Sequence, residues 1–256
     1  TDRRVARRTA APAEVFPCGV CAGEAPVWNV LSRGFGNIFE AEKKFMRKIA
    51  IYVHGKGGNA SEAEHYIPLL DDYEIVGFDY MTSTPWEARD EFRGFFAQYA
   101  DYDSVILIAN SIGAYFSMLA LGADFSSWAR VDHAFFISPV VDMEKLVCNM
   151  MLWANISEGE LREKGVIPTS FGETLSWRYL SYVREHPICW NVPTDILYGS
   201  EDNLISYSDV RSFAEQTKAT LTVMEGGEHW FHTKLQIDFL DNWLKNLLAK
   251  KSEFFI

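Results

Sequence analysis

The stretch "LIANSIGAYFSM", residues 107–118, places one serine between an apolar run and the beginning of a helical pattern. Ser111 can be explained in two ways. As a helix N-cap, its hydroxyl would accept a hydrogen bond from a free amide of the first turn. As a nucleophile, it would stand on a sharp strand-to-helix turn, for which the small Ala109 and Gly113 leave room. The remainder of the chain must decide between the two.

Short β-branched and apolar runs alternate with helical patterns from Lys48 onward. The predicted strands cover residues 48–53, 74–78, 104–109, 133–138, 194–199 and 219–224. The predicted helices lie near 61–70, at 85–100, from 112 and at about 233–249. Thr84, Pro85 and Glu87 have the spacing of a capping box at the start of the second of these helices. Strands that are apolar on both faces and joined by helices favour an α/β fold, in which a mostly parallel sheet is covered by helices on both faces.

Residues 142–188 interrupt this alternation, because they contain no convincing strand pattern. Apolar residues recur there at helical spacing: Met143, Leu146, Val147, Met150 and Met151. Two further helical patterns follow at 157–164 and 174–185. We therefore expect a helical insertion within the folded domain.

Residues 1–45 have a different character from the rest of the chain. They show neither helical nor strand periodicity, are rich in Pro, Gly, Ala and Arg, and are followed by Met46 and the first predicted strand. We expect a disordered or non-native extension here, with an organelle-targeting peptide as the alternative, and a folded domain at 46–256.

The formal net charge is −11, which disfavours binding to nucleic acid because both partners would carry the same sign. No apolar run reaches the roughly 18 residues that a membrane-spanning helix requires. Four cysteines favour a reducing compartment such as the cytoplasm, and we expect Cys148 and Cys189 to be buried. The "CGVC" pair at 18–21 has no second pair or Cys/His cluster nearby, so no metal site is predicted.

If Ser111 is a nucleophile, it needs a base to take its proton and an acid to orient that base. Asp202 follows a predicted strand in "TDILYGSEDNLI", and His229 follows the last strand, 27 residues later, in "TVMEGGEHWF". The competitors are Glu201 for the acid and His232 for the base. His232 ranks lower because we expect it to lie within the final helix.

Four segments of the chain resemble motifs of the α/β-hydrolase superfamily. "ANSIG" resembles its nucleophile elbow G-x-S-x-G, with Ala109 in place of the first glycine, and the order Ser, Asp, His is that of the family. "YVHGKGGN" at 52–59 resembles its H-G-x-G-G oxyanion loop. The resemblance covers residues 48–249. It implies an α/β-hydrolase fold with a cap at 142–188, a catalytic triad of Ser111, Asp202 and His229, and oxyanion donors at the amides of Lys56 and Ile112.

The function implied by the resemblance is that of a serine hydrolase acting on a small carboxylic ester or thioester, with no cofactor. Two alternatives remain open: an acyltransferase, perhydrolase or lyase that uses the same triad, and a non-catalytic member that binds a ligand. Aromatic residues of the insertion favour an apolar substrate pocket, unless they merely pack the cap onto the body: Trp153, Phe171, Trp177 and Tyr179.

Overall fold

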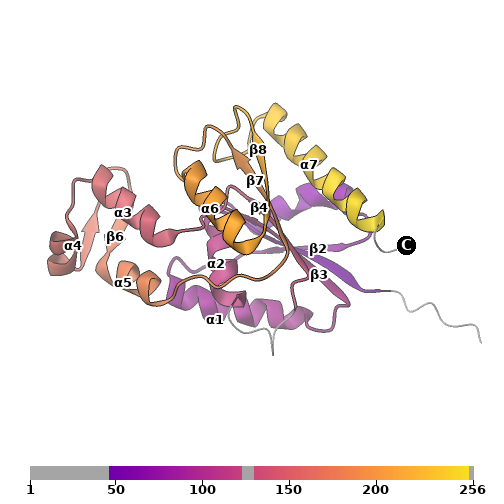
Figure 1. Cartoon of the computed structure of the whole chain (residues 1–256). Coiled ribbons are helices and arrows are strands. Elements are labelled where there is room, and N and C mark those ends of the chain that lie inside the picture. The colour runs from indigo at the N-terminus through magenta and orange to yellow at the C-terminus, as the bar shows by residue number, and fades with distance from the viewer. Residues whose placement is uncertain (1–45, 123–129, 254–256) are drawn as a thin grey trace, which may run out of the picture. The chain divides into compact units, whose positions relative to one another are not determined.

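The computed structural model describes residues 46–122 and 130–253. The predictions for residues 1–45, including the "CGVC" pair, lie outside these ranges. Within them, the main sheet has six strands in the order β2-β1-β3-β4-β7-β8, and every pairing in it is parallel (Figure 1). The strands are β1 (Lys48–Val53), β2 (Glu74–Phe78), β3 (Ser104–Asn110), β4 (His133–Ile137), β7 (Thr194–Gly199) and β8 (Thr220–Met224).

Two apolar layers cover this sheet, because alternate side chains of each strand point to opposite faces. On one face, Ile51, Leu107 and Phe136 belong to a buried cluster with the helices α1 (Pro85–Phe96), α2 (Ser111–Leu121) and α6 (Tyr207–Thr217). On the other face, Tyr52 and Ile108 are buried with the 3₁₀ helix η1 (Ala60–Leu69) and with α7 (Lys234–Glu253). The predicted parallel sheet with helices on both faces is confirmed.

The helix caps differ from the prediction. Thr84 precedes α1, but its hydroxyl donates to the Glu87 carboxylate at 2.5 Å and does not accept from the helix backbone. A capping box occurs one helix earlier, where the Asn59 side chain accepts from Ser61 N–H and Glu62 Oε1 accepts from Asn59 N–H. α1 also ends at Phe96, and a short 3₁₀ turn, η2 (Ala97–Tyr99), completes the predicted span.

The chain between β4 and β7 leaves the sheet, as expected, and its elements lie at the left of Figure 1. They are α3 (Met143–Trp153), α4 (Glu158–Lys164), β5 (Val166–Pro168), β6 (Thr174–Ser176) and α5 (Trp177–Glu185). β5 and β6 form an antiparallel pair, so the expectation of a strand-free insertion was wrong. The Arg184 guanidinium joins the helices, because it donates to Glu144 of α3 and Glu158 of α4.

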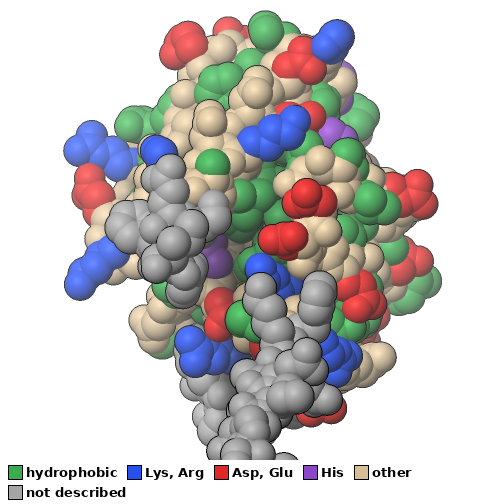
Figure 2. Space-filling model, turned by 90° about the vertical axis from the view of Figure 1, so that its right-hand side faces the viewer, with side chains coloured by type: hydrophobic (Ala, Val, Ile, Leu, Met, Phe, Trp, Pro, Cys, Tyr) green, Lys and Arg blue, Asp and Glu red, His purple; other side chains and the backbone are tan. Residues whose placement is uncertain are grey.

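Cys148 is half-buried and Cys189 is exposed, so the expectation that both are buried was wrong. On the face opposite to the insertion, acidic and basic side chains are interspersed (Figure 2). Among the described residues, no helix is both long enough and apolar enough to cross a membrane.

Candidate active site

Ser111 is the first residue of α2, and Asn110 occupies the N-cap position before it. The backbone of Ser111 has φ of +50°, a left-handed conformation that costs a non-glycine residue about 1–3 kcal/mol. Its Oγ lies 2.8 Å from Nε2 of His229. Ser111 is therefore not the N-cap of α2, and the strained turn presents its hydroxyl beyond the carboxyl end of β3.

Asp202, His229 and Ser111 form one chain of hydrogen bonds. Nδ1 of His229 lies 2.7 Å from Oδ2 of Asp202, opposite the nitrogen that faces Ser111. A carboxylate only accepts hydrogen bonds, so the proton of this contact belongs to Nδ1 and the lone pair of Nε2 faces the serine hydroxyl. Three side chains that follow the carboxyl ends of β3, β7 and β8 thus meet at one edge of the sheet.

The Asp202 carboxylate is fixed by its own loop. Its side chain is fully buried, and Oδ1 accepts from the backbone N–H groups of Leu204 and Ile205, both at 2.9 Å. The hydroxyl of Tyr198 donates to the carbonyl of Ile205 at 2.8 Å. Burial, together with the nearby Asp202, raises the pKa of Tyr198 to about 12, so this phenol remains a donor at neutral pH. These bonds leave Oδ2 free to orient His229.

The loops that carry Asp202 and His229 are also bound to each other. Glu201 N–H donates to the carbonyl of Gly227 at 2.8 Å, and Gly226 N–H donates to the hydroxyl of Ser200 at 2.8 Å. Gly199 lies so close that a β-carbon there would come within 2.3 Å of the Gly227 oxygen. The distance between acid and imidazole is therefore set by backbone contacts.

The competing residues lie elsewhere. Glu201 is exposed, and its recorded contact with the histidine loop is made by its backbone. His232 lies before α7, not within it as expected; its Nδ1 is 2.7 Å from the carbonyl of Trp230, and the two rings stack.

The predicted oxyanion loop lies beside the serine. Gly58 N–H donates to the carbonyl of Gly55, and the φ of +78° at Gly57 is that of the third residue of a type II turn. A β-carbon on Gly55 would lie 3.3 Å from Cβ of Ser111. Lys56 occupies the second turn position, and Ile112 follows Ser111 on α2. The amides of both residues are thus carried by backbone segments that flank the serine hydroxyl.

His54 anchors the base of this loop. Its side chain is buried, its ring stacks on Tyr80 at 4.3 Å, and its Nδ1 is 2.8 Å from the carbonyl of Gly55. Tyr80 donates its hydroxyl to the carbonyl of His54 at 3.0 Å. The loop therefore leaves β1 in a direction fixed by two aromatic rings.

The insertion contacts the predicted oxyanion loop through the ion pair between Lys56 and Glu173. The Lys56 side chain is 66% exposed, so it points away from the body of the domain. Trp153 and Phe171 are exposed and contact each other, whereas Tyr179 packs on Trp86 of α1. Of the four aromatic residues predicted to form a pocket, Trp153 and Phe171 are thus exposed.

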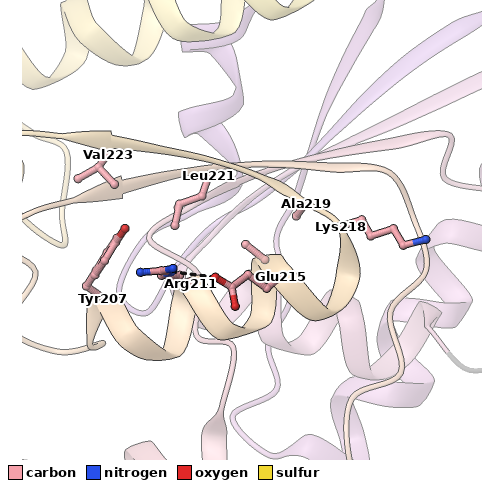
Figure 3. Close-up of a pocket in the computed structure, with 8 residues that line it drawn as sticks. Tyr207, Arg211, Glu215, Lys218, Ala219, Leu221 and Val223 are labelled. Carbon is pink, nitrogen blue, oxygen red and sulfur yellow. Dashed lines mark hydrogen bonds and ion pairs between the residues drawn. The ribbon is translucent and has the colours of Figure 1, made fainter.

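Two surface hollows lie away from Ser111. One, of about 420 Å³, lies between α6 and β8, where Arg211 pairs with Glu215 (Figure 3). The other, of about 310 Å³, lies where the insertion meets α2 and α6. Within residues 46–122 and 130–253, no cluster of His, Cys, Asp and Glu side chains has the geometry of a metal site.

Solved structures share the fold of this chain, but the sequence comparisons found no match. No family model and no curated protein sequence matches the chain. Solved structures do match it. Est1E from Butyrivibrio proteoclasticus has a TM-score of 0.61 at 14% identity, covering 83% of this chain and 91% of that one. Alpha/beta hydrolase domain-containing protein 10 from mouse has a TM-score of 0.60 at 17% identity, covering 78% and 89%. An esterase from Pyrococcus furiosus has a TM-score of 0.52 at 18% identity, covering 80% and 81%. The chain therefore has the fold of the α/β-hydrolases.

Proposed function

We propose that this protein is a serine hydrolase that cleaves a small carboxylic ester or thioester through an acyl-enzyme intermediate. The observation that carries the proposal is the unbroken chain of hydrogen bonds from Ser111 Oγ through the His229 ring to Asp202, at 2.8 and 2.7 Å. A structural serine or histidine needs no such arrangement. The strained backbone of Ser111 supports the same conclusion, because strain of this kind is concentrated at functional sites.

In the first half of the reaction, Ser111 Oγ attacks the carbonyl carbon while its proton passes to Nε2 of His229. The carbonyl oxygen becomes an oxyanion, which accepts hydrogen bonds from the amides of Lys56 and Ile112. The tetrahedral intermediate then collapses. The bond to the alcohol or thiol breaks, and the leaving group takes the proton from Nε2.

In the second half, water attacks the acyl-enzyme and gives a proton to Nε2. Collapse of the second tetrahedral intermediate releases the carboxylic acid and returns that proton to Ser111 Oγ. Throughout both halves, Asp202 keeps Nδ1 protonated and stabilises the imidazolium that forms twice. No cofactor enters this cycle.

A fluorophosphonate probe tests the nucleophile directly. We expect phosphonylation of Ser111, mapped by mass spectrometry, and its loss in His229→Ala. If Ser111 does not react in the wild-type protein, the alternative of a non-catalytic, ligand-binding α/β-hydrolase replaces this proposal.

A substrate panel tests the reaction. It should contain p-nitrophenyl esters and acyl thioesters of increasing chain length. An aromatic ester belongs in it because one of the similar structures is Est1E with ferulic acid bound. We expect hydrolysis of at least one compound. If Ser111 is acylated but water does not release the acyl group unless another acceptor is added, the protein is an acyltransferase.

A further inference from the structure

We propose that Tyr52, Asn110 and Glu62 are positioning residues that hold the oxyanion loop against the nucleophile. This inference rests on the proposed function, and it concerns side chains outside the triad and the oxyanion donors. Asn110 Nδ2 lies 2.9 Å from the Tyr52 hydroxyl, and that hydroxyl lies 2.5 Å from Oε2 of Glu62. We call these three side chains the relay.

The direction of each hydrogen bond in the relay follows from its chemistry. Glu62 as a carboxylate can only accept, so the single proton of the Tyr52 hydroxyl must point to Glu62. The Tyr52 oxygen can then only accept from Asn110, whose amide must present its NH₂ group. Burial raises the pKa of Tyr52 well above its ordinary value, so the phenol keeps this proton at neutral pH.

Both ends of the relay reach the candidate active site. Asn110 immediately precedes Ser111. At the other end, Glu62 Oε1 accepts from Asn59 N–H at 3.2 Å, and it lies where a β-carbon on Gly58 would be only 2.6 Å away. The Glu62 carboxylate therefore supports the end of the oxyanion loop.

Backbone contacts also connect the oxyanion loop to Ser111. Gly58 N–H donates to the Gly55 carbonyl, and Gly55 packs on Cβ of Ser111. Starting from Ser111, a closed path thus runs through Asn110, the side chains of Tyr52 and Glu62, and the turn that carries Lys56.

Such a support is needed because the two oxyanion donors belong to different segments. Lys56 lies after β1, and Ile112 lies at the start of α2. A displacement of about 1 Å in one donor can cost a factor on the order of 10² in rate, since the donors must already be in place when charge develops. The relay lies on the opposite side of the sheet from α1 and α2, in the layer of Tyr66 and α7, where Tyr52 is 1% exposed. It can fix this geometry without contacting the substrate.

Tyr52→Phe breaks both hydrogen bonds and keeps the packed ring. We expect kcat for p-nitrophenyl butyrate to fall about tenfold with KM within a factor of about two, as for an interaction made only in the transition state. The inhibition constant of phenylboronic acid, whose tetrahedral adduct occupies the oxyanion site, should rise by the same factor. Tyr66→Phe is the matched control, because this tyrosine is buried beside Tyr52 at 5.3 Å between ring centres but is not part of the relay.

Glu62→Gln and Asn110→Asp keep the test decisive if Tyr52→Phe folds poorly. Glu62→Gln retains one acceptor oxygen, so we expect a loss of about threefold in kcat. Asn110→Asp places an acceptor against an oxygen that has no proton left to give, so we expect a loss of at least tenfold. Thermal melting should show all three variants folded at the assay temperature.

The results separate the two proposals. If the wild-type protein hydrolyses the ester and the relay variants match it in kcat and in boronate inhibition, the relay has no positioning role and the proposed function stands. If kcat falls and boronate inhibition does not change, the effect is not on the oxyanion site and the inference is wrong. If the wild-type protein is inert and Ser111 is not phosphonylated, both proposals are overturned.

Discussion

Gly113 lies against the carbonyl oxygen of His54, so closely that a β-carbon at Gly113 would come within 2.3 Å of that oxygen. This contact presses the first turn of α2 onto the end of β1. It brings the segment that carries Ser111 next to the segment that carries Lys56. The serine and the predicted oxyanion loop can thus approach each other because Gly113 has no side chain.

Gly113→Ala should lower both stability and activity. Alanine is favoured over glycine within a helix by up to about 1 kcal/mol, so helix propensity alone would predict stabilisation. We expect instead a net loss of about 1–3 kcal/mol from overpacking against the His54 carbonyl. Urea unfolding and ester hydrolysis measure the two effects.

Gly94→Ala is the control for this substitution. Gly94 lies within α1, and a β-carbon there would meet nothing within 4 Å. We expect it to raise the free energy of unfolding by about 0.5–1 kcal/mol and to leave activity unchanged. Equal behaviour of the two variants would show that the contact at Gly113 has no consequence.

Lys56→Pro separates the backbone of Lys56 from its side chain. Lys56 is the second residue of the type II turn, a position that proline commonly occupies, so the turn should persist while its amide N–H is lost. We expect kcat to fall by a factor on the order of 10²–10³, the usual effect of losing one oxyanion donor. Steady-state kinetics with a p-nitrophenyl ester provide the measurement.

Lys56→Ala keeps the amide and removes the ion pair with Glu173. Because exposed ion pairs contribute about 0–1 kcal/mol, stability should change little and kcat should stay within about threefold of wild type. An alanine variant as inactive as the proline variant would assign the effect to the ammonium group and contradict the proposed donor.

Asp202→Asn should leave the fold intact and inactivate the enzyme. Asparagine can still accept from the amides of Leu204 and Ile205, but its NH₂ group would then face Nδ1 of His229. The imidazole is driven to the tautomer with its proton on Nε2, which cannot accept from Ser111. We expect kcat to fall by a factor on the order of 10³–10⁴. Wild-type activity in this variant would exclude Asp202 from the triad.

The protein should lose stability in alkali as its buried tyrosines ionise. Burial raises the pKa of Tyr198 to about 12 and that of Tyr66 and Tyr115 further. The pKa of an unfolded tyrosine is about 10, so the folded state favours the neutral phenol. The Tyr198 contribution is therefore complete below about pH 10 and is lost as pH rises towards 12.

Urea unfolding between pH 8 and 12, with phenolate absorbance followed in parallel, measures this dependence. In Tyr198→Phe, the free energy of unfolding should fall less steeply between pH 10 and 12 than in the wild type. Tyr207→Phe removes a tyrosine that is 48% exposed and is the control for the loss of a phenol. Parallel curves for wild type and Tyr198→Phe would contradict the assignment.

The sheet could be predicted because the apolar residues of each strand already indicate that the strand is buried. β3 and β7 are apolar on both faces, a pattern typical of a parallel sheet that is covered on both sides. The candidate site could be located for a related reason. In a parallel sheet, the residues that follow each strand meet at one edge, so Ser111, Asp202 and His229 are expected near one another although they are far apart in sequence.

What was missed depended on weaker or non-local signals. Helix α6 was not predicted, although Ser206 and Asp209 have N-cap spacing and Val210, Phe213 and Ala214 recur at helical intervals. β5 and β6 have three residues each, too few for a period to be visible. The burial of Cys189 was predicted from apolar neighbours, but burial depends on tertiary packing.

The relay was missed because Asn110 is remote in sequence from both Tyr52 and Glu62. One part of the relay has a local sequence signal, since Asn59 and Glu62 have the spacing of a capping box. That spacing predicts a helix start and says nothing about Tyr52. The contact between Tyr52 and Asn110 follows only from the pairing of β1 with β3, which places the ends of these strands side by side.

The insertion departs from β4 and returns to β7, and these two strands are neighbours in the sheet. Its two attachment points are therefore adjacent, while Ser111, Asp202 and His229 all lie outside it. The segment from α3 to α5 is thus one continuous insertion between two neighbouring strands. A shorter or longer connection between the same two strands would therefore keep the order of the sheet and the strand ends that carry the reacting side chains.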